Sequence, residues 1–163
     1  MPRLKRLQRV QDLPGRLEQV FQFFQRPENL ARITPPEQAF EILTPSPIAM
    51  QLGARIDYRL RVFGLWMRWT SEITAYEPPL GFVDVQVRGP YGYWHHRHAF
   101  EQISAEIVRM TDTVDYALPL WPLSELGGSQ LVARQLARIF DYRREAVERL
   151  FAPRAFAGAT AGS

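Results

Sequence analysis

Three histidines, the only ones in the chain, lie within four positions, as His95, His96 and His98. On a strand, His96 and His98 share one face, and His95 points the opposite way. Such a pair can supply two ligands to a metal, with Asp112 as a candidate third, or can exchange protons near neutral pH. We favour hydrogen-bonded or pocket-lining histidines, and therefore predict no metal site, no cofactor and no catalytic residue.

Four polar side chains on nearby predicted strands could orient these rings: Asp84, Gln86, Asp112 and Asp115. The alternation of side chains along a strand decides which of them face inward. Segment 82–88 is ambiguous, because either its three valines or the alternating set that contains Asp84 can form the inner face. We expect the valines to be buried and Asp84 to lie nearer a rim.

Arg143 follows Leu136 by seven positions, which places it on the apolar face of the predicted C-terminal helix. It could reach a carboxylate or phosphate of a ligand, or form an ion pair with Asp112 or Asp115. Because a buried charge without a partner is costly, an anion must face it. We expect the ion pair.

The composition excludes several kinds of chemistry. The chain has 163 residues and no cysteine, so disulfides, thiolate nucleophiles and cysteine-ligated metals are absent. It also lacks the phosphate-binding, dinucleotide-binding and nucleophile-elbow motifs. Its 20 basic residues face 17 acidic ones and are scattered, so we expect no DNA partner.

Apolar stretches are only a few residues long, which is far below the ~20 residues that span a bilayer. The basic N-terminus lacks the apolar run of a signal peptide. We therefore expect a cytoplasmic protein without a transmembrane segment, present as a monomer or homodimer.

Apolar spacing in the first part of the chain predicts helices. Leu17, Val20, Phe21 and Phe24 recur at helical spacing. A second short helix can start at Pro27 and must stop before 34–36, where two prolines follow a threonine. Segment 3–11 is either a short strand or an irregular lead-in.

The middle of the chain alternates between apolar and polar residues, and Gly and Pro interrupt it. This pattern predicts an antiparallel meander with strands at 40–43, 56–62, 66–75, 82–88, 91–102 and 107–118. Beyond 127–128, apolar residues recur at helical spacing up to Phe151, which predicts a long helix lying across the sheet. We expect one domain over 1–151 and a flexible tail over 152–163.

This order of elements resembles the START-like, helix-grip fold of the SRPBCC superfamily, related to polyketide cyclase/dehydrase and coenzyme-Q-binding proteins. The chain is similar in sequence to a bacterial ligand-binding branch of this superfamily in six segments: 20–24, 27–30, 33–36, 89–91, 94–98 and 139–143. The resemblance runs from about residue 3 to 151. It implies an α+β fold, in which a curved antiparallel sheet of about six to seven strands wraps around a long C-terminal helix. It also implies an apolar cavity between the sheet and that helix.

The resemblance implies that the chain binds a hydrophobic or amphipathic small molecule, such as a lipid, a quinone or a polyketide-like compound. An ordinary solid core is the alternative to a cavity. Two alternative functions remain: an acid/base enzyme of cyclase or dehydratase type using His96 or His98, and a module that contacts RNA or the ribosome. We expect binding without catalysis. The predicted ligand-binding residues are Tyr58, Leu60, Trp69, Trp94, His96, His98, Phe100, Tyr116 and Arg143.

Overall fold

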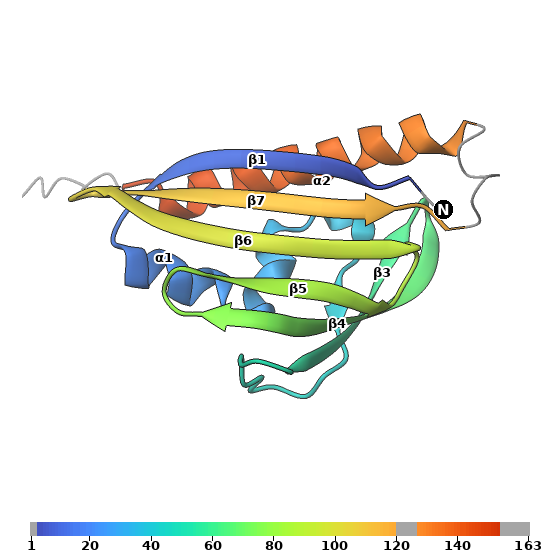
Figure 1. Ribbon diagram of the computed structural model, residues 1–163, viewed down its shortest axis with the longest axis horizontal. Helices are drawn as coiled ribbons and strands as arrows, with labels where there is room; N and C mark the ends of the chain where they lie inside the picture. Colours follow the sequence, from blue (N-terminus) through green and yellow to red (C-terminus); the bar gives the residue numbers. More distant parts are fainter. Residues whose placement is uncertain (1–2, 120–126, 154–163) are drawn as a thin grey trace, which may run out of the picture.

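The computed structural model describes residues 3–119 and 127–153, and in them a seven-stranded antiparallel sheet packs against one long helix (Figure 1). The strand order is β1-β7-β6-β5-β4-β3-β2. The elements are β1 (Lys5–Pro14), α1 (Leu17–Phe24), the 3-10 helices η1 (Pro27–Ile33) and η2 (Pro36–Gln38), β2 (Glu41–Ile42), β3 (Arg55–Val62), β4 (Leu65–Glu77), β5 (Gly81–Arg88), β6 (Tyr93–Ser104), β7 (Ile107–Ala117) and α2 (Gly128–Phe151).

The helices form where the apolar spacing predicts them. Helix α1 buries Val20, Phe21 and Phe24 on one face and ends just before Pro27. Pro27 then opens η1, where its missing N–H is no loss. Helix α2 confirms the long C-terminal helix, and it runs along the sheet behind β1 and β7 in Figure 1.

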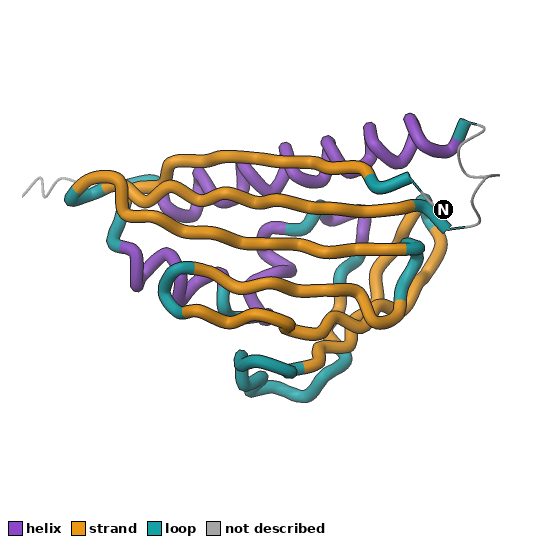
Figure 2. The backbone as a smooth tube through the Cα atoms, viewed as in Figure 1, coloured by secondary structure: helices purple, strands orange, loops and turns teal. Residues whose placement is uncertain are grey.

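The predicted meander is confirmed, and segment 3–11 belongs to a regular strand. Figure 2 shows the strands as one continuous curved layer. β1 pairs with β7 over its whole length, from Lys5 opposite Tyr116 to Pro14 opposite Ile107. The strand predicted at 40–43 is shorter than expected, because β2 pairs with β3 over two residues only.

Two apolar clusters fill the space between the sheet and the helices. One contains Phe21, Phe82 and Phe100, which meet edge to face at centroid distances of 5.7–6.1 Å. The other contains Trp94 of β6 and Phe140 of α2. Since α2 contributes to both clusters, it fixes the spacing between the two ends of the sheet.

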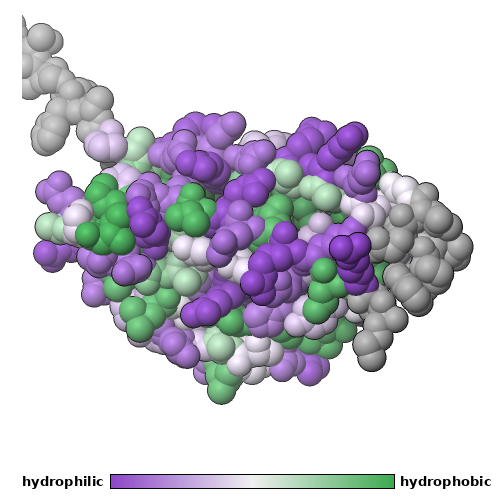
Figure 3. All heavy atoms as spheres, turned by 45° about the horizontal axis from the view of Figure 1, so that its top comes forward, coloured by the Kyte–Doolittle hydropathy of each residue, from purple (hydrophilic) through white to green (hydrophobic). Residues whose placement is uncertain are grey.

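No helix in the described ranges is both long and apolar enough to cross a membrane. On the face turned forward in Figure 3, hydrophilic side chains predominate and apolar ones are scattered. Most of the predicted tail, residues 154–163, lies outside the described part of the chain.

Candidate functional site

A cavity of about 160 Å³ lies between the inner face of the sheet and α2. Its walls come from the strands β3 to β6, from α2 and from the 3-10 helices η1 and η2. One water molecule occupies about 30 Å³ of liquid, so the space is large enough for a small organic molecule. The structure therefore contains a cavity where a solid core was the alternative.

Aromatic rings form much of the apolar wall. Tyr58 and Trp69 stack at 5.8 Å, and Trp94 meets Trp69 edge to face at 5.1 Å. Ser71 holds this group in place, since its hydroxyl accepts a hydrogen bond from Trp69 Nε1 at 3.1 Å and lies 3.2 Å from the Tyr58 hydroxyl. Burial raises the pKa of Tyr58 well above its ordinary value, so its phenol stays protonated.

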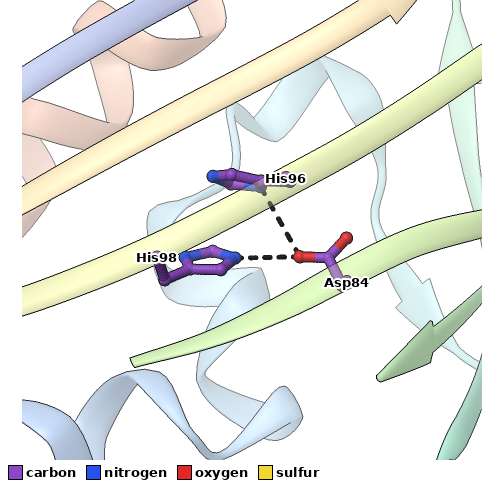
Figure 4. A group of neighbouring side chains, drawn as sticks. All are labelled: Asp84, His96 and His98. Atoms are coloured by element: carbon purple, nitrogen blue, oxygen red, sulfur yellow. Dashed lines mark hydrogen bonds and ion pairs between the residues drawn. The ribbon is translucent and has the colours of Figure 1, made fainter. Parts of the chain in front are cut away.

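A polar cluster made of Asp84, His96, His98, Asp112 and Arg143 adjoins the aromatic wall, since the rings of Trp94 and His96 meet at 6.3 Å. All its members except Asp112 line the cavity. The strand register brings the first four together, because Asp84 lies opposite His96 and His98 lies opposite Asp112. His98 Nε2 is 2.8 Å from Asp84 Oδ2, and His96 Nε2 is 2.8 Å from Asp112 Oδ1. Figure 4 shows Asp84 pointing at both rings, with its Oδ2 3.6 Å from His96 Nδ1.

The inward position of Asp84 corrects the expectation for segment 82–88. Phe82 and Asp84 line the cavity, whereas Val87 on the other face is 50% exposed. The placement of the valines inside was therefore wrong. Burial of the Asp84 carboxylate is tolerable because His98 donates to it.

Two of the four candidate orienting groups serve other purposes. Gln86 donates to the backbone carbonyl of Tyr91 at 2.8 Å and accepts from its N–H at 3.1 Å, which holds the β5–β6 turn. Asp115 lies on the outer face of β7 and binds Arg6 through both carboxylate oxygens, at 2.6 and 2.8 Å. Neither contacts His96 or His98, although Asp115 lies opposite His95 in the strand register.

Opposing effects set the protonation of the two carboxylates and two rings. Burial opposes the charge on Asp112, but Arg143 and both rings outweigh it and hold the pKa of that carboxyl well below its usual value. Asp84 has a lowered pKa through the same balance, with the His98 hydrogen bond as the main opposing effect.

The surroundings shift the pKa values of His96 and His98 in opposite directions. Burial lowers the pKa of His96, and the neighbouring His98 lowers it further. Burial also opposes the charge on His98, but hydrogen bonds to Asp112 and Asp84 outweigh it and raise the pKa. Of the two rings, His98 is therefore the one that holds a positive charge more readily, next to the carboxylates of Asp84 and Asp112.

Arg143 is the least satisfied member of the polar cluster. Its side chain is 12% exposed, its Nε lies 3.9 Å from Asp112 Oδ2, and its guanidinium lies over the rings of Phe24 and Phe140 at 5.8 and 5.7 Å. The expected ion pair is thus confirmed with Asp112 and not with Asp115. Within the described ranges the guanidinium makes no hydrogen bond, and its buried Nε has no hydrogen-bond partner.

His98 Nδ1 is the second buried nitrogen without a hydrogen bond. Asp112 Oδ1 lies 3.2 Å away, which suits electrostatic attraction. It lies outside the alignment that a hydrogen bond requires, so we count Nδ1 as unsatisfied.

Asp84, His96 and His98 also form the ligand set of two histidines and one carboxylate that several divalent metals accept. Their ligand atoms all lie within 4.8 Å of one another. These atoms face one another in the structure, because Asp84 Oδ2 lies 2.8 Å from His98 Nε2 and 3.6 Å from His96 Nδ1. A metal bound by this set would replace these contacts.

Of the side chains predicted to bind ligand, Phe100 and Tyr116 lie outside the cavity wall. Phe100 packs against Phe21 and Phe24 in the core, and Tyr116 packs against Tyr91. The others do line the wall: Tyr58, Leu60, Trp69, Trp94, His96, His98 and Arg143.

Sequence reasoning missed part of the wall. The 3-10 helices and the segment after them contribute Ile33 and Phe40, and α2 contributes Leu136 and Phe140. The helical spacing marks the two α2 residues as inward-facing. No sequence signal distinguishes them from ordinary core residues.

The strand order, the long helix across the curved sheet and the cavity between them define the START-like helix-grip fold of the SRPBCC proteins. Solved structures share it at low sequence identity. An aromatase/cyclase from a Streptomyces species has a TM-score of 0.70 and 17% identity over 96% of this chain and 100% of that one.

Two further structures extend the comparison. A START superfamily protein from Mycobacterium smegmatis has a TM-score of 0.65 and 11% identity over 89% of this chain and 98% of its own. A major latex-like protein from Panax ginseng has a TM-score of 0.64 and 14% identity, covering 92% and 99%. No protein-family model matches the sequence, and a comparison with curated proteins gives no match.

Proposed function

We propose that the chain binds an amphipathic small molecule with an apolar body and an acidic head, as in a fatty acid, a hydroxyquinone or a polyketide-like phenol. The observation that carries the proposal is the guanidinium of Arg143, which lines an otherwise largely apolar cavity and makes no hydrogen bond to the described residues. A guanidinium binds carboxylate and phosphate oxygens through paired N–H groups.

The cavity supports the apolar part of the ligand. Aromatic rings such as Trp69 and Trp94 offer large contact surfaces and lose little rotamer freedom. At about 160 Å³ the space is below the ~300–1,000 Å³ that is typical of ligand pockets. The chain in this conformation therefore suits a one- or two-ring compound or a medium-length alkyl chain.

Pairs of probes that share a body and differ in the head test the proposal. We expect decanoic acid and 2-naphthoic acid to raise the melting temperature and to stay bound in native mass spectrometry, and decanol and 2-naphthalenemethanol to bind more weakly. A hydrogen bond to a charged group contributes about 1.5–3 kcal/mol, so the acids should bind roughly 10–100-fold more tightly.

Arg143→Met should remove the preference for the acid while retaining binding of the alcohol. Arg138→Met is the matched control, because Arg138 lies on the same helix with an 83% exposed side chain and should leave both affinities unchanged. A melting temperature that ignores acids and alcohols alike would contradict ligand binding. Equal affinities for acid and alcohol would contradict the role of Arg143.

Acid/base catalysis in the same cavity is a second candidate. It is favoured by His98, whose pKa is raised and which pairs with Asp84 inside the cavity wall. One protein of similar fold is an aromatase/cyclase. If His98 and Asp84 exchange protons with a ligand, the chain should speed deuterium exchange next to the carbonyls of a bound 1,3-dicarbonyl probe. His98→Gln should abolish the effect, and an equal rate without protein would exclude it.

A further inference from the structure

The turn between β3 and β4 exposes three large apolar side chains together. Phe63 is 50% exposed, Leu65 65% and Trp66 49%. We call Phe63, Leu65 and Trp66 the turn patch. In Figure 1 this turn lies at the end of β4 remote from the β4–β5 turn. Burial in the chain's own core explains none of the three.

The backbone conformation of the turn is unfavourable for a phenylalanine at position 63. Phe63 has φ +49° and Gly64 has φ +77°, so both central residues of the two-residue turn are left-handed. Such turns favour Asn-Gly, and a bulky residue in the left-handed region is an outlier. A phenylalanine that strains the backbone and leaves half its surface in water points to a contact outside the chain.

Arginines on the outer face of the hairpin surround the turn patch. The Trp66 ring lies between Arg59 and Arg61, whose guanidinium carbons are 4.9 and 5.0 Å from its centroid. Arg59 pairs with Glu41 at 2.6 Å. For Arg61 and Arg68, no acidic partner is found within the described part of the chain. This edge therefore combines unneutralised positive charge with apolar side chains.

We propose that the turn patch docks on an anionic lipid membrane, with Phe63, Leu65 and Trp66 in the headgroup region and Arg61 and Arg68 against lipid phosphates. Trp is favoured at that depth, and each arginine near an anionic surface adds attraction. Nucleic acid fits the arginines, but it offers no apolar medium for Leu65 and Phe63. Val62, the residue before the patch, lines the cavity, so docking would bring the cavity close to the lipid.

Vesicle sedimentation without added ligand tests docking, so its outcome is independent of the proposed ligand. The chain should bind vesicles containing phosphatidylglycerol, release them as salt is raised, and bind pure phosphatidylcholine weakly. Brominated lipids should quench tryptophan fluorescence in wild type more strongly than in Trp66→Gln.

Phe63→Asn separates docking from stability, because asparagine suits the left-handed turn. This variant should melt at an equal or higher temperature, yet bind anionic vesicles about tenfold or more weakly, which is the range expected for burial of one phenylalanine. Leu80→Ser is the matched control. Leu80 is 57% exposed and follows the other end of β4, so its loss should leave vesicle binding unchanged.

Several results would overturn the proposal: unchanged vesicle binding by Phe63→Asn, equal binding to neutral and anionic vesicles, or an equal loss in Leu80→Ser. Salt-sensitive retention of RNA with no retention of vesicles would assign the arginines to nucleic acid instead.

Discussion

Asp112→Asn removes one charge from the polar cluster while keeping the side-chain shape. Asp112 is 6% exposed and faces three nitrogens: His96 Nε2 at 2.8 Å, His98 Nδ1 at 3.2 Å and Arg143 Nε at 3.9 Å. In the variant, His98 and Arg143 remain buried with the single carboxylate of Asp84. The substitution therefore removes one of the two negative charges that face Arg143 and the histidine rings inside the protein.

The magnitude follows from this imbalance. Removing one partner of a buried ion pair costs about 3–5 kcal/mol. The amide oxygen can still accept from His96, so we expect the lower end, about 3 kcal/mol. A domain of this size is stable by about 5–15 kcal/mol, so the variant should fold but unfold at a lower urea concentration. The pKa of His98 should fall as well, because one of its two carboxylate partners is neutral.

Urea unfolding at pH 7, followed by tryptophan fluorescence, measures the first effect, and NMR titration of the imidazole signals measures the second. Asp115→Asn is the matched control, since it makes the same change three residues along β7 on the outer face, where Asp115 pairs with the exposed Arg6. Exposed pairs contribute little, so this variant should unfold close to wild type.

Equal losses of stability in Asp112→Asn and Asp115→Asn, together with an unchanged pKa of His98, would refute the reasoning. That result would mean that the charges in the cluster are compensated in another way. If Asp112→Asn does not fold, Asp84→Asn should still lower the pKa of His98, because it removes the other carboxylate.

Three further predictions concern the cavity wall and its supports. The raised pKa of His98 provides stability that is complete below its unfolded value of 6.5 and is lost as pH rises through the folded value. The free energy of unfolding should therefore decline above pH 6.5, and it should decline less in His98→Gln. Gly81→Ala should destabilise by about 1–3 kcal/mol in urea, because its Cβ would strike the backbone carbonyl of His98. Ser71→Ala should lower the stability by about 1–3 kcal/mol in the same assay, since Trp69 and Tyr58 lose their shared partner.

The order of the elements was predictable because each has a local cause. Alternation marks β3 and β4, prolines bound α1 and η1, and the spacing from Leu136 to Val147 requires α2 to be buried on one face. The pairing from β3 through β7 then follows from short connections. The pairing of β1 with β7 is the exception, since it joins strands far apart in the sequence.

The face of β5 was not predictable for the opposite reason. On hydrophobicity alone, the face with three valines is the better candidate for the inner face. The other face is buried instead because Asp84 meets His98, fourteen residues further on, and Arg143 on α2. Phe100 and Tyr116, which were predicted to bind ligand, are buried but do not line the cavity. Which part of the sheet stands away from the helix depends on tertiary packing. The residue types and spacing of Phe100 and Tyr116 do not predict it.

The pairing of β1 with β7 has a consequence for how the chain folds during synthesis. Pro14 lies opposite Ile107 and Lys5 opposite Tyr116, so the first strand made must wait for nearly the last one before it has a partner. Closing such long loops slows folding, and an unpaired strand edge invites pairing with other chains. Until β7 has been made, β1 is thus a strand whose edge has no partner within its own sheet.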